Sequence, residues 1–362
     1  MSKSCYPDFV AGRGAPANAS PSRFNLKSRE ADGDWLDERE KVDGTAKSQK
    51  TQVTTERPKS ILARNTSPDI PFDKSVNPYR GCEHGCIYCY ARPSHAYHDL
   101  SPGLDFETRL FAKPDAAKLL RTEIGRKGHV PTPIAFGTNT DTYQPIEREW
   151  RIMRQCVEVL AGANHPLTIT TKSDRVLRDL DLLAPMAAKG LVAVAVSVTM
   201  LDPALHRILE PRAPRPEKRL AAIRGLASAG IPTHVNVAPI IPAINDGELE
   251  AILEQAALAG AKTATWIPVR LPHEVAPLFR HWLQVHFPER AGKVMSIIRS
   301  IRDGRDNDPD FFRRMRGSGP WADLIRTRFR VAAGKLGLNQ CRIELRSDLF
   351  VPPRSDGQLE LF

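Results

Sequence analysis

Short apolar runs alternate with amphipathic stretches along the middle of the chain. From about residue 75 to residue 270 the apolar runs are four to eight residues long, the length of buried strands, and the stretches between them repeat apolar residues at helical spacing. The pattern predicts six strands, at Ser75–Tyr79, Ile134–Gly137, Leu167–Thr171, Val192–Val198, Thr233–Ile240 and Ala264–Val269. It predicts helices near Asp115–Arg126, Glu147–Leu160, Arg175–Ala188, Glu217–Ala229 and Glu248–Ala259.

The spacing of these strands predicts a parallel sheet. From the second strand onward, each strand starts 33, 25, 41 and 31 residues after the one before it, which is the length of a strand–helix–strand unit. Pro114 and Asp115 mark a helix start, and Gly190 and Gly230 stand where helix C-caps belong. We therefore predict an α/β fold in which helices connect parallel strands.

The two ends of the chain differ from this middle part. Residues 1–70 are rich in Ser, Lys, Asp, Gly and Pro, which predicts a largely disordered N-terminal extension with order beginning near Ser75. Residues 71–271 hold the strand–helix units, residues 272–350 form a basic and mostly helical extension, and residues 351–362 form a flexible polar tail. The length suits one large domain with tails.

Composition adds charge and a compartment to this picture. The 362 residues include 52 Lys and Arg against 42 Asp and Glu, which gives a formal charge of +10. No secretory signal begins the sequence, and the longest apolar run, residues 191–201, is too short to cross a bilayer. The 6 cysteines show no disulfide-like framework, so the chain is predicted to be cytoplasmic and not bound to a membrane.

Three of the cysteines lie close together. Cys82, Cys86 and Cys89 form a C-x3-C-x2-C spacing. Thiolates suit zinc or an iron–sulfur cluster, and a cubane cluster ordinarily takes four of them. A cubane that is held by only three keeps one iron open, and an open position distinguishes a reactive metal site from a structural one. The alternative is a zinc site completed by His84 or a distant cysteine, and no second ligand pair follows in the sequence.

The cysteine run, with the aromatic Tyr88 before its last cysteine, resembles the signature of the radical S-adenosylmethionine (SAM) enzymes. The resemblance implies a [4Fe-4S] cluster on Cys82, Cys86 and Cys89 whose open iron chelates SAM, and it places Tyr88 among the residues that bind this cofactor. It implies that an electron from the cluster, supplied by a donor such as flavodoxin or ferredoxin, cleaves SAM to a 5′-deoxyadenosyl radical. It also implies a partial (β/α)6 barrel with its site at the carboxyl ends of the strands.

Loops after the later strands carry polar residues where SAM would lie. Thr138 and Asn139 match in position the family's loop that contacts the SAM amino group. Lys172 ends the third strand, where its ammonium group would hold the SAM carboxylate. Ser197, on the fourth strand, and Arg212 are weaker candidates for ribose or carboxylate contacts. The alternative for each of them is an ordinary loop or capping residue.

Three further segments narrow the resemblance to one branch of the superfamily. Residues 77–82 (Asn-Pro-Tyr-Arg-Gly-Cys), 89–93 (Cys-Tyr-Ala-Arg-Pro) and 141–147 (Asp-Thr-Tyr-Gln-Pro-Ile-Glu) resemble the proteins grouped with spore photoproduct lyase as DNA repair photolyase-like. The likeness covers about residues 60–272. That lyase has a hydrogen-donating cysteine near the end of its second strand, whereas residues 136–139 contain none. We therefore do not carry over repair of a thymine dimer.

The C-terminal extension is rich in arginine. Residues 270–330 hold 13 basic and 7 acidic side chains, an excess that is compatible with phosphate contacts. Aromatic residues suited to stacking on bases lie among them. The segment includes Arg299, Arg302, Arg313, Arg314, Arg316, Phe311, Phe312 and Trp321. The alternative is a solvated basic face without a nucleic-acid partner.

The last five residues, Gln-Leu-Glu-Leu-Phe, resemble the peptide by which bacterial DNA polymerases and repair proteins dock onto the DNA sliding clamp. Leu361 and Phe362 would fill a pocket of the clamp while Gln358 forms a hydrogen bond at its rim. A polar tail that ends in Leu and Phe favours this interpretation, because exposed apolar surface lowers solubility unless a partner covers it. The alternative is a tail that folds back on its own barrel.

Together these features predict a cytoplasmic radical SAM enzyme that acts on DNA in a repair-like, lyase-like reaction. Two alternatives stay open. One is a radical SAM enzyme that modifies RNA or protein, and the other is a non-catalytic iron–sulfur protein that senses redox state on DNA or on the clamp. Cleavage of SAM under anaerobic reduction separates the last alternative from the other two.

Overall fold

The fold is built on one open sheet of mostly parallel strands. The computed structural model describes residues 12–18 and 50–353. The seven-stranded sheet has the order β10 (Thr263–Pro268), β9 (Thr233–Ile240), β8 (Val192–Ser197), β7 (Leu167–Thr171), β6 (Ile134–Phe136), β3 (Lys74–Val76) and β2 (Leu62–Arg64). All neighbours are parallel except β2, which is antiparallel to β3. The six parallel strands confirm the predicted α/β fold and its partial barrel.

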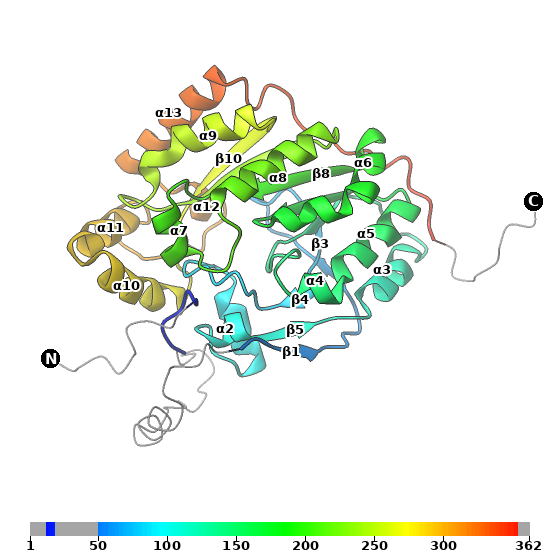
Figure 1. The fold of residues 1–362 in the computed structure, drawn as a ribbon, viewed down its shortest axis with the longest axis horizontal. Helices are drawn as coiled ribbons and strands as arrows, with labels where there is room; N and C mark the ends of the chain where they lie inside the picture. Colours follow the sequence, from blue (N-terminus) through cyan, green and yellow to red (C-terminus); the bar gives the residue numbers. More distant parts are fainter. Residues whose placement is uncertain (1–11, 19–49, 354–362) are drawn as a thin grey trace, which may run out of the picture.

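Side chains alternate between the two faces of this sheet. On β7, Leu167 and Ile169 are fully buried, whereas Thr168 and Thr170 are only half-buried. The buried face packs against five helices, which cover it in Figure 1. These helices are α3 (Ala116–Ile124), α5 (Ile152–Gly162), α6 (Leu180–Ala188), α8 (Pro216–Ser228) and α9 (Leu249–Leu258). The half-buried face is therefore the inner face of the open barrel.

Two of the predicted helices are divided. Residues 147–160 form α4 (Glu147–Trp150) and then α5, and between them Arg151 has a left-handed φ of 48°. The division arises because the Glu147 carboxylate accepts a hydrogen bond from the backbone N–H of Met153 (3.1 Å) and so caps the start of α5. Residues 175–188 likewise begin as the 3₁₀ helix η2 (Asp174–Asp179) before α6.

Order begins earlier than the expected position near Ser75. β1 (Gln52–Thr55) pairs with β5 (Arg109–Ala112), which pairs with β4 (Tyr79–Arg80) in a second, three-stranded sheet. Within the range 1–70, the structure describes residues 12–18 and 50–70 only, and both of these parts are ordered.

Residues 12–18 form a short segment, which we call the N-terminal strap, against α2 (Asp105–Thr108) and the loop that contains Gly85. Its Ala15 is fully buried. The Glu107 carboxylate accepts hydrogen bonds from the backbone N–H groups of Gly14 (3.0 Å) and Ala15 (2.9 Å). The strap is therefore fixed by a residue about ninety positions away, which no local pattern in the strap reveals.

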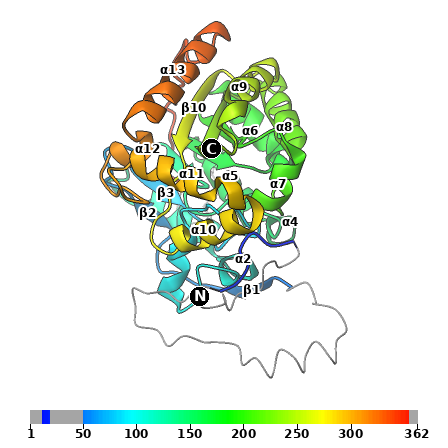
Figure 2. The same ribbon diagram turned by 90° about the vertical axis from the view of Figure 1, so that its left-hand side faces the viewer.

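The predicted helical C-terminal region is confirmed. It contains α10 (Val275–His286), α11 (Pro288–Ser300), α12 (Arg313–Arg316) and α13 (Pro320–Lys335). Figure 2 shows α13 beside α9 and β10. The chain after α13 runs back across the helix layer, where the backbone N–H of Val351 donates to the carbonyl of Ala163 (2.9 Å).

The predicted clamp-binding residues Gln358, Leu361 and Phe362 lie outside the described residues. Among the helices that the structure describes, none is long and apolar enough to cross a membrane.

Candidate active site

The three clustered cysteines lie on one loop, residues 81–90, which we call the cysteine loop. It follows β3 and the short strand β4, so it begins at the carboxyl end of the first parallel strand, as predicted. Cys82 and Cys86 are each 8% exposed, Cys89 is half-buried, and all three are free thiols. The loop therefore brings three sulfur ligands together at the edge where sites of parallel barrels form.

Backbone contacts hold the cysteine loop in place and leave its sulfurs available. The N–H of Cys82 donates to the carbonyl of Phe106 (2.9 Å), and the N–H of Ile87 donates to that of Leu209 (3.2 Å). The carbonyl of Cys86 accepts a hydrogen bond from Nε of Arg92 (3.0 Å). The loop shape is thus set by main-chain bonds to three other segments.

The donor set of the cysteine loop suits an iron–sulfur cluster, because thiolates are soft ligands and each thiolate of a cubane binds a different iron. Among the described residues, no three His, Cys, Asp or Glu side chains converge as ligands of one ion. Burial, and then the charge of Glu210, raise the pKa of the Cys86 thiol to about 12. Bound iron would remove that proton, because a coordinated thiol is deprotonated.

The segment 141–147 braces the cysteine loop against the sheet. The Asp141 carboxylate accepts from Oγ1 of Thr171 and from the backbone N–H of Lys172, both at 2.7 Å. The Gln144 side chain accepts from the N–H of Glu83 (2.9 Å) and donates to the carbonyl of Gly81 (3.1 Å). The motif therefore ties the cysteine loop to the end of β7.

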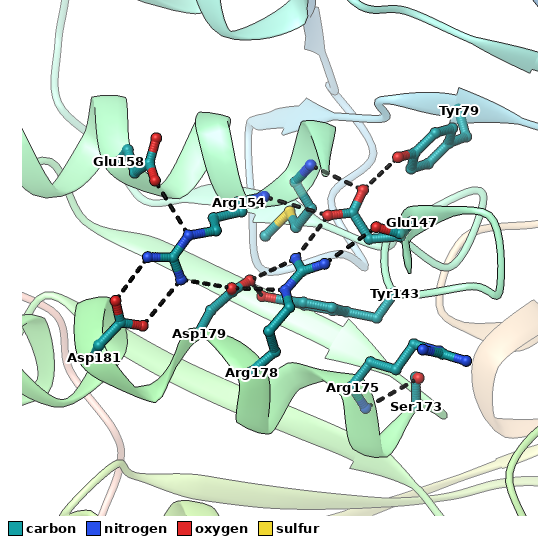
Figure 3. Close-up of polar contacts among 11 residues, drawn as sticks. Tyr79, Tyr143, Glu147, Arg154, Glu158, Ser173, Arg175, Arg178, Asp179 and Asp181 are labelled. Carbon is teal, nitrogen blue, oxygen red and sulfur yellow. Dashed lines mark hydrogen bonds and ion pairs between the residues drawn. The ribbon is translucent and has the colours of Figure 1, made fainter. Parts of the chain in front are cut away.

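A buried network of charges extends this brace, as Figure 3 shows. Glu147 is fully buried and accepts hydrogen bonds from the Tyr79 hydroxyl and from Arg178 (2.8 Å). The hydroxyl of Tyr143 donates to Asp179 (2.9 Å), which also bonds Arg178 (2.9 Å). Because each carboxylate already has a cationic partner, the members of this network are not available to a substrate.

Lys172 lies next to the cysteine loop, as its assigned role requires. Its Nζ is 5.8 Å from the centre of the Tyr88 ring and forms no hydrogen bond with another described residue. Burial lowers the pKa of Lys172, but Cys86 and Glu210 raise it more, so its pKa lies above the usual range. A cation that is held close to the cysteines without a hydrogen-bond partner suits a carboxylate ligand.

Tyr88 and Ser197 belong to a buried network around Glu210. The Glu210 carboxylate accepts hydrogen bonds from the hydroxyls of Tyr88 and Thr199 and from the guanidinium of Arg219. Burial raises the pKa of Glu210, but Arg219 and Lys172 lower it to about 2. The carbonyl of Ser197 accepts from Arg219 (3.2 Å). Sequence reasoning missed Glu210 and Arg219, which orient these two predicted residues.

Thr138 and Asn139 are tied to the start of the cysteine loop. The side-chain oxygen of Asn77 accepts from the backbone N–H of Asn139 (3.1 Å), and its amide lies 3.3 Å from Oγ1 of Thr138. The Tyr90 hydroxyl donates to the carbonyl of Thr138. The loop after β6 therefore contacts the cysteine loop directly, as its predicted position beside the SAM amino group requires.

Polar residues line the inner face beyond these loops. His234 and Asn236 point inward from β9, and Thr265 points inward from β10. Nε2 of His234 lies 2.9 Å from Oγ1 of Thr265, which donates to Asn236 (2.8 Å). Burial lowers the pKa of His234 to about 4, so its ring is neutral near pH 7. The barrel interior thus offers neutral hydrogen-bonding groups.

Arg212 lies at the outer rim of the site. Its guanidinium forms an ion pair with Glu83 (3.0 Å), and its backbone N–H donates to the carbonyl of His84 (3.3 Å). It lines a cavity of about 400 Å³ together with His84, Pro145, Ser173, Asp174, Arg175, Ala213, Pro214, Arg215 and Lys218. We call this space the rim cavity.

One further ion pair holds the cysteine loop, and the sequence pointed to only one of its members, since Arg92 lies in the motif segment 89–93 and Glu107 lies in no motif. Arg92 and Glu107 are both completely buried and form an ion pair. Arg92 also donates to the carbonyls of Pro102 (3.1 Å) and Gly103 (2.9 Å). The pair joins the cysteine loop to the N-terminal strap, because Glu107 also holds that strap.

The arginines of the C-terminal region mostly have partners within the fold. Arg314 pairs with Asp69 (2.6 Å), Arg299 pairs with Asp306 (2.9 Å), and Arg313 pairs with Asp303. Arg302 is fully buried and donates to the carbonyl of Val269 (2.8 Å). Of the five predicted phosphate contacts, only Arg316 has no partner among the described residues.

Comparison with known proteins adds a family and two groups of relatives. A model of the radical SAM superfamily matches residues 76–256. An uncharacterized protein of Mycobacterium tuberculosis is 41% identical over 232 residues, which cover 64% of this chain and 68% of the relative. An uncharacterized protein of Methanocaldococcus jannaschii is 28% identical over 221 residues, which cover 61% of this chain and 79% of the relative.

Among solved structures, spore photoproduct lyase complexed with dinucleoside spore photoproduct has a TM-score of 0.57 at 16% identity, over 79% of this chain and 80% of that one. A mutant of that lyase with the same dinucleoside has a TM-score of 0.54 at 16% identity, over 88% and 87% of the two chains. At this identity the likeness shows a shared fold.

Proposed function

The chain belongs to the radical SAM superfamily, whose enzymes use a [4Fe-4S] cluster and SAM, and from this premise we propose that it acts on DNA in a repair-like reaction. The observation that carries the proposal is the fold shared with a lyase that was solved with a dinucleoside photoproduct, over four-fifths of both chains. The motif segments 77–82, 89–93 and 141–147 support it, because they lie together around the cysteine loop.

We assign roles to the residues of the carboxyl edge accordingly. Cys82, Cys86 and Cys89 hold the cluster, which supplies the electron for reductive cleavage of SAM when both groups are bound. Lys172 would bind the SAM carboxylate, and the loop of Thr138 and Asn139 would contact the SAM amino group. The role of Lys172 rests on its place beside Tyr88 without a hydrogen-bond partner among the described residues.

Ser197 and Arg212 receive smaller roles. The carbonyl of the buried Ser197 accepts a hydrogen bond from Arg219, which keeps the end of β8 in place where SAM would bind. Arg212 pairs with Glu83 and faces the rim cavity, so it positions the cysteine loop from outside.

The reaction outcome differs from that of spore photoproduct lyase. Residues 136–139, at the end of β6, contain no thiol to return a hydrogen atom to a substrate radical. The exposed Tyr90 lies beside this segment, since its hydroxyl bonds the carbonyl of Thr138. We therefore propose a DNA reaction other than reversal of a thymine dimer.

Transfer of label tests the proposal. The full chain is reconstituted anaerobically and reduced with SAM in the presence of DNA, RNA or total protein that carries deuterium. We expect 5′-deoxyadenosine to form and to gain deuterium from DNA alone. Deuterium gained from RNA or protein, with none from DNA, would replace the DNA proposal by the corresponding alternative. No SAM cleavage at all would leave the redox-sensing alternative.

We further propose that the C-terminal peptide docks the enzyme on the DNA sliding clamp through Leu361 and Phe362, with Gln358 at the pocket rim. The sequence of the last five residues supports this proposal. A peptide of residues 355–362 should bind purified clamp with micromolar affinity, about −7 to −8 kcal/mol. Replacing both apolar residues by Ala should remove nearly all binding, since each contributes about 1.5–3 kcal/mol. A full chain that fails to bind the clamp would refute the proposal.

A further inference from the structure

The rim cavity has a strongly basic lining. Arg175 lies at the start of η2, Arg212 and Arg215 lie on the connection before α8, and Lys218 lies in the first turn of α8. Asp174 is the one carboxylate among the lining residues. With a volume of about 400 Å³, the cavity has the size of a site for a small ligand or for one unit of a polymer.

Two of these cations have side chains that bond no other described residue. Neither Arg175 nor Arg215 forms an ion pair or side-chain hydrogen bond with another described residue. Figure 3 shows the Arg175 side chain extending away from the carboxylates of Glu147 and Asp179, which Arg154 and Arg178 occupy instead. Arginines that fold into no internal network, beside a network that uses two others, are available to a ligand.

The remaining two cations are partly neutralised. Nζ of Lys218 is 3.9 Å from Asp174, but the lysine side chain is 66% exposed, so this pair contributes little. Arg212 is held by Glu83. With four cations and one carboxylate among the lining residues, the net charge of the lining stays positive.

The backbone adds to this positive potential. α8 has 13 residues, begins at Pro216, and has no side-chain hydrogen bond at its N-cap, Arg215. The positive end of the helix dipole therefore faces the same space as the free guanidinium groups, and helix N-termini favour phosphate groups.

The cavity adjoins the cysteine loop from outside the barrel. His84 of the cysteine loop, which is 2% exposed, lines the cavity, and its Nδ1 lies 3.4 Å from the Asp141 carboxylate. Ser173 lies two residues past the end of β7, and Pro145 belongs to the loop after β6. An anion bound here would lie at the same carboxyl edge as Lys172, on the other side of the loop.

We propose that the rim cavity binds a backbone phosphate of the nucleic acid on which the enzyme acts, and so places a neighbouring nucleotide at the barrel mouth. Planar guanidinium groups bind phosphate through paired hydrogen bonds, which makes arginine better suited than lysine to hold one phosphate in a fixed position. The proposal rests on the proposed function for its choice of DNA as the source of the phosphate.

The test compares two double variants of the full chain. Arg175→Ala with Arg215→Ala removes the free guanidinium groups, while the backbone contacts of both residues remain. Arg207→Ala with Arg224→Ala removes the same charge from exposed positions on α7 (Pro203–Leu209) and α8 that do not line the cavity. Thermal unfolding of all three proteins checks that the fold is retained.

Fluorescence anisotropy with a labelled DNA oligonucleotide then gives affinity across a series of salt concentrations. We expect the cavity variant to bind about tenfold more weakly at 0.1 M salt and to lose about one unit of the salt slope, the effect of one phosphate contact. The control variant should follow the wild type. Equal losses in the two variants would overturn the proposal, since they would show a general charge effect.

A second experiment uses DNA in which one backbone phosphate is replaced by an uncharged linkage. One methylphosphonate linkage is moved stepwise through the oligonucleotide. At one position it should weaken binding of the wild type about tenfold and leave the cavity variant unchanged, since that variant has already lost the contact. A linkage effect that is the same in both proteins would overturn the proposal.

The two arms separate this proposal from the proposed function. DNA that gives up deuterium to the wild type, with equal binding by cavity and control variants, removes the cavity proposal and keeps the function. Label transfer from RNA or protein instead removes DNA as the source. If the wild type binds no DNA, free inorganic phosphate is titrated, and protection of the unfolding transition in the wild type alone would show a site for a small phosphate compound in place of DNA.

Discussion

The carboxyl edge of the barrel and the C-terminal helical region use the same residue types in opposite ways. In the C-terminal region, Arg314 and Arg299 pair with carboxylates, and Arg302 is buried against a backbone carbonyl. At the carboxyl edge, Arg175 and Lys172 have no such partner among the described residues. Charge counted along the sequence pointed to the first region. The contacts show that a cation is available for ligands only where no side chain or carbonyl of the fold already bonds it.

Burial explains part of this difference. Arg302 is fully buried, so its guanidinium needs a partner, which the carbonyl of Val269 supplies. Arg299 and Arg313 are about half exposed and are paired because carboxylates lie beside them. At the carboxyl edge, the exposed Arg215 remains stable without a partner because water solvates it.

The largest contrast between the two regions is expected at their cysteines. Cys86→Ala, at the carboxyl edge, should abolish SAM cleavage and leave a labile or incomplete cluster, whereas the wild type should hold about four irons per chain. Cys341→Ala is the control, because Cys341 is an exposed free thiol beyond α13. Iron, sulfide and 5′-deoxyadenosine are measured after anaerobic reconstitution. Stoichiometric zinc without sulfide would contradict the assignment.

The next largest effect is expected on stability, at the buried ion pair between Arg92 and Glu107. Glu107→Ala should lower the free energy of unfolding by about 3–5 kcal/mol, because it leaves the buried Arg92 guanidinium without its partner. Asp323→Ala should change it little, since the Arg326–Asp323 pair on α13 is half exposed. Denaturant unfolding gives both values. Similar values for the two variants would show that the Arg92–Glu107 pair is not a structural support.

A smaller effect is expected at the SAM carboxylate. Lys172→Ala should weaken SAM binding by about 1.5–3 kcal/mol, the usual contribution of a charge-assisted hydrogen bond, with the iron content unchanged. Lys189→Ala removes a lysine that bonds Asn164 at the opposite end of the helix layer, and it should bind SAM normally. Equilibrium binding to the reconstituted proteins distinguishes them. Normal SAM affinity of the Lys172 variant would place the carboxylate elsewhere.

The smallest effect is expected in the C-terminal region. Arg299→Ala with Arg313→Ala should leave the salt slope of DNA affinity unchanged, since both side chains already bond carboxylates. A fall of about two units would mean that these pairs open to bind phosphates, and the contrast between the regions would then be lost.

The sequence predicted the strands and helices well because each of them spaces its apolar residues in a regular local pattern. β7 and β9 have the predicted bounds, since their apolar residues alternate with polar ones facing the barrel interior. The cysteine loop was located for a similar reason, because all its ligands lie within one short segment.

The supports of the site were not predicted, because they join residues that are distant in sequence. Glu210 receives Tyr88 from 122 positions away, and Glu107 receives the backbone of Gly14 from 93 positions away. No regular spacing of residues along the sequence predicts such distant pairs. The break between α4 and α5 at Arg151 was not predicted either, because it depends on the side chain of Glu147, which caps the start of α5.

The N-terminal strap is expected to be part of the smallest fragment that keeps activity. A Cβ on Gly14 would come within 1.6 Å of the carbonyl oxygen of Gly85, so this part of the strap fits the cysteine loop only as glycine. A fragment that starts at residue 71 would contain every proposed ligand, yet it would strip two N–H donors from the buried Glu107. Deleting the strap would therefore weaken the support of the iron–sulfur site. A truncated protein that loses the colour of its cluster on purification would do so because the strap no longer contacts the cysteine loop.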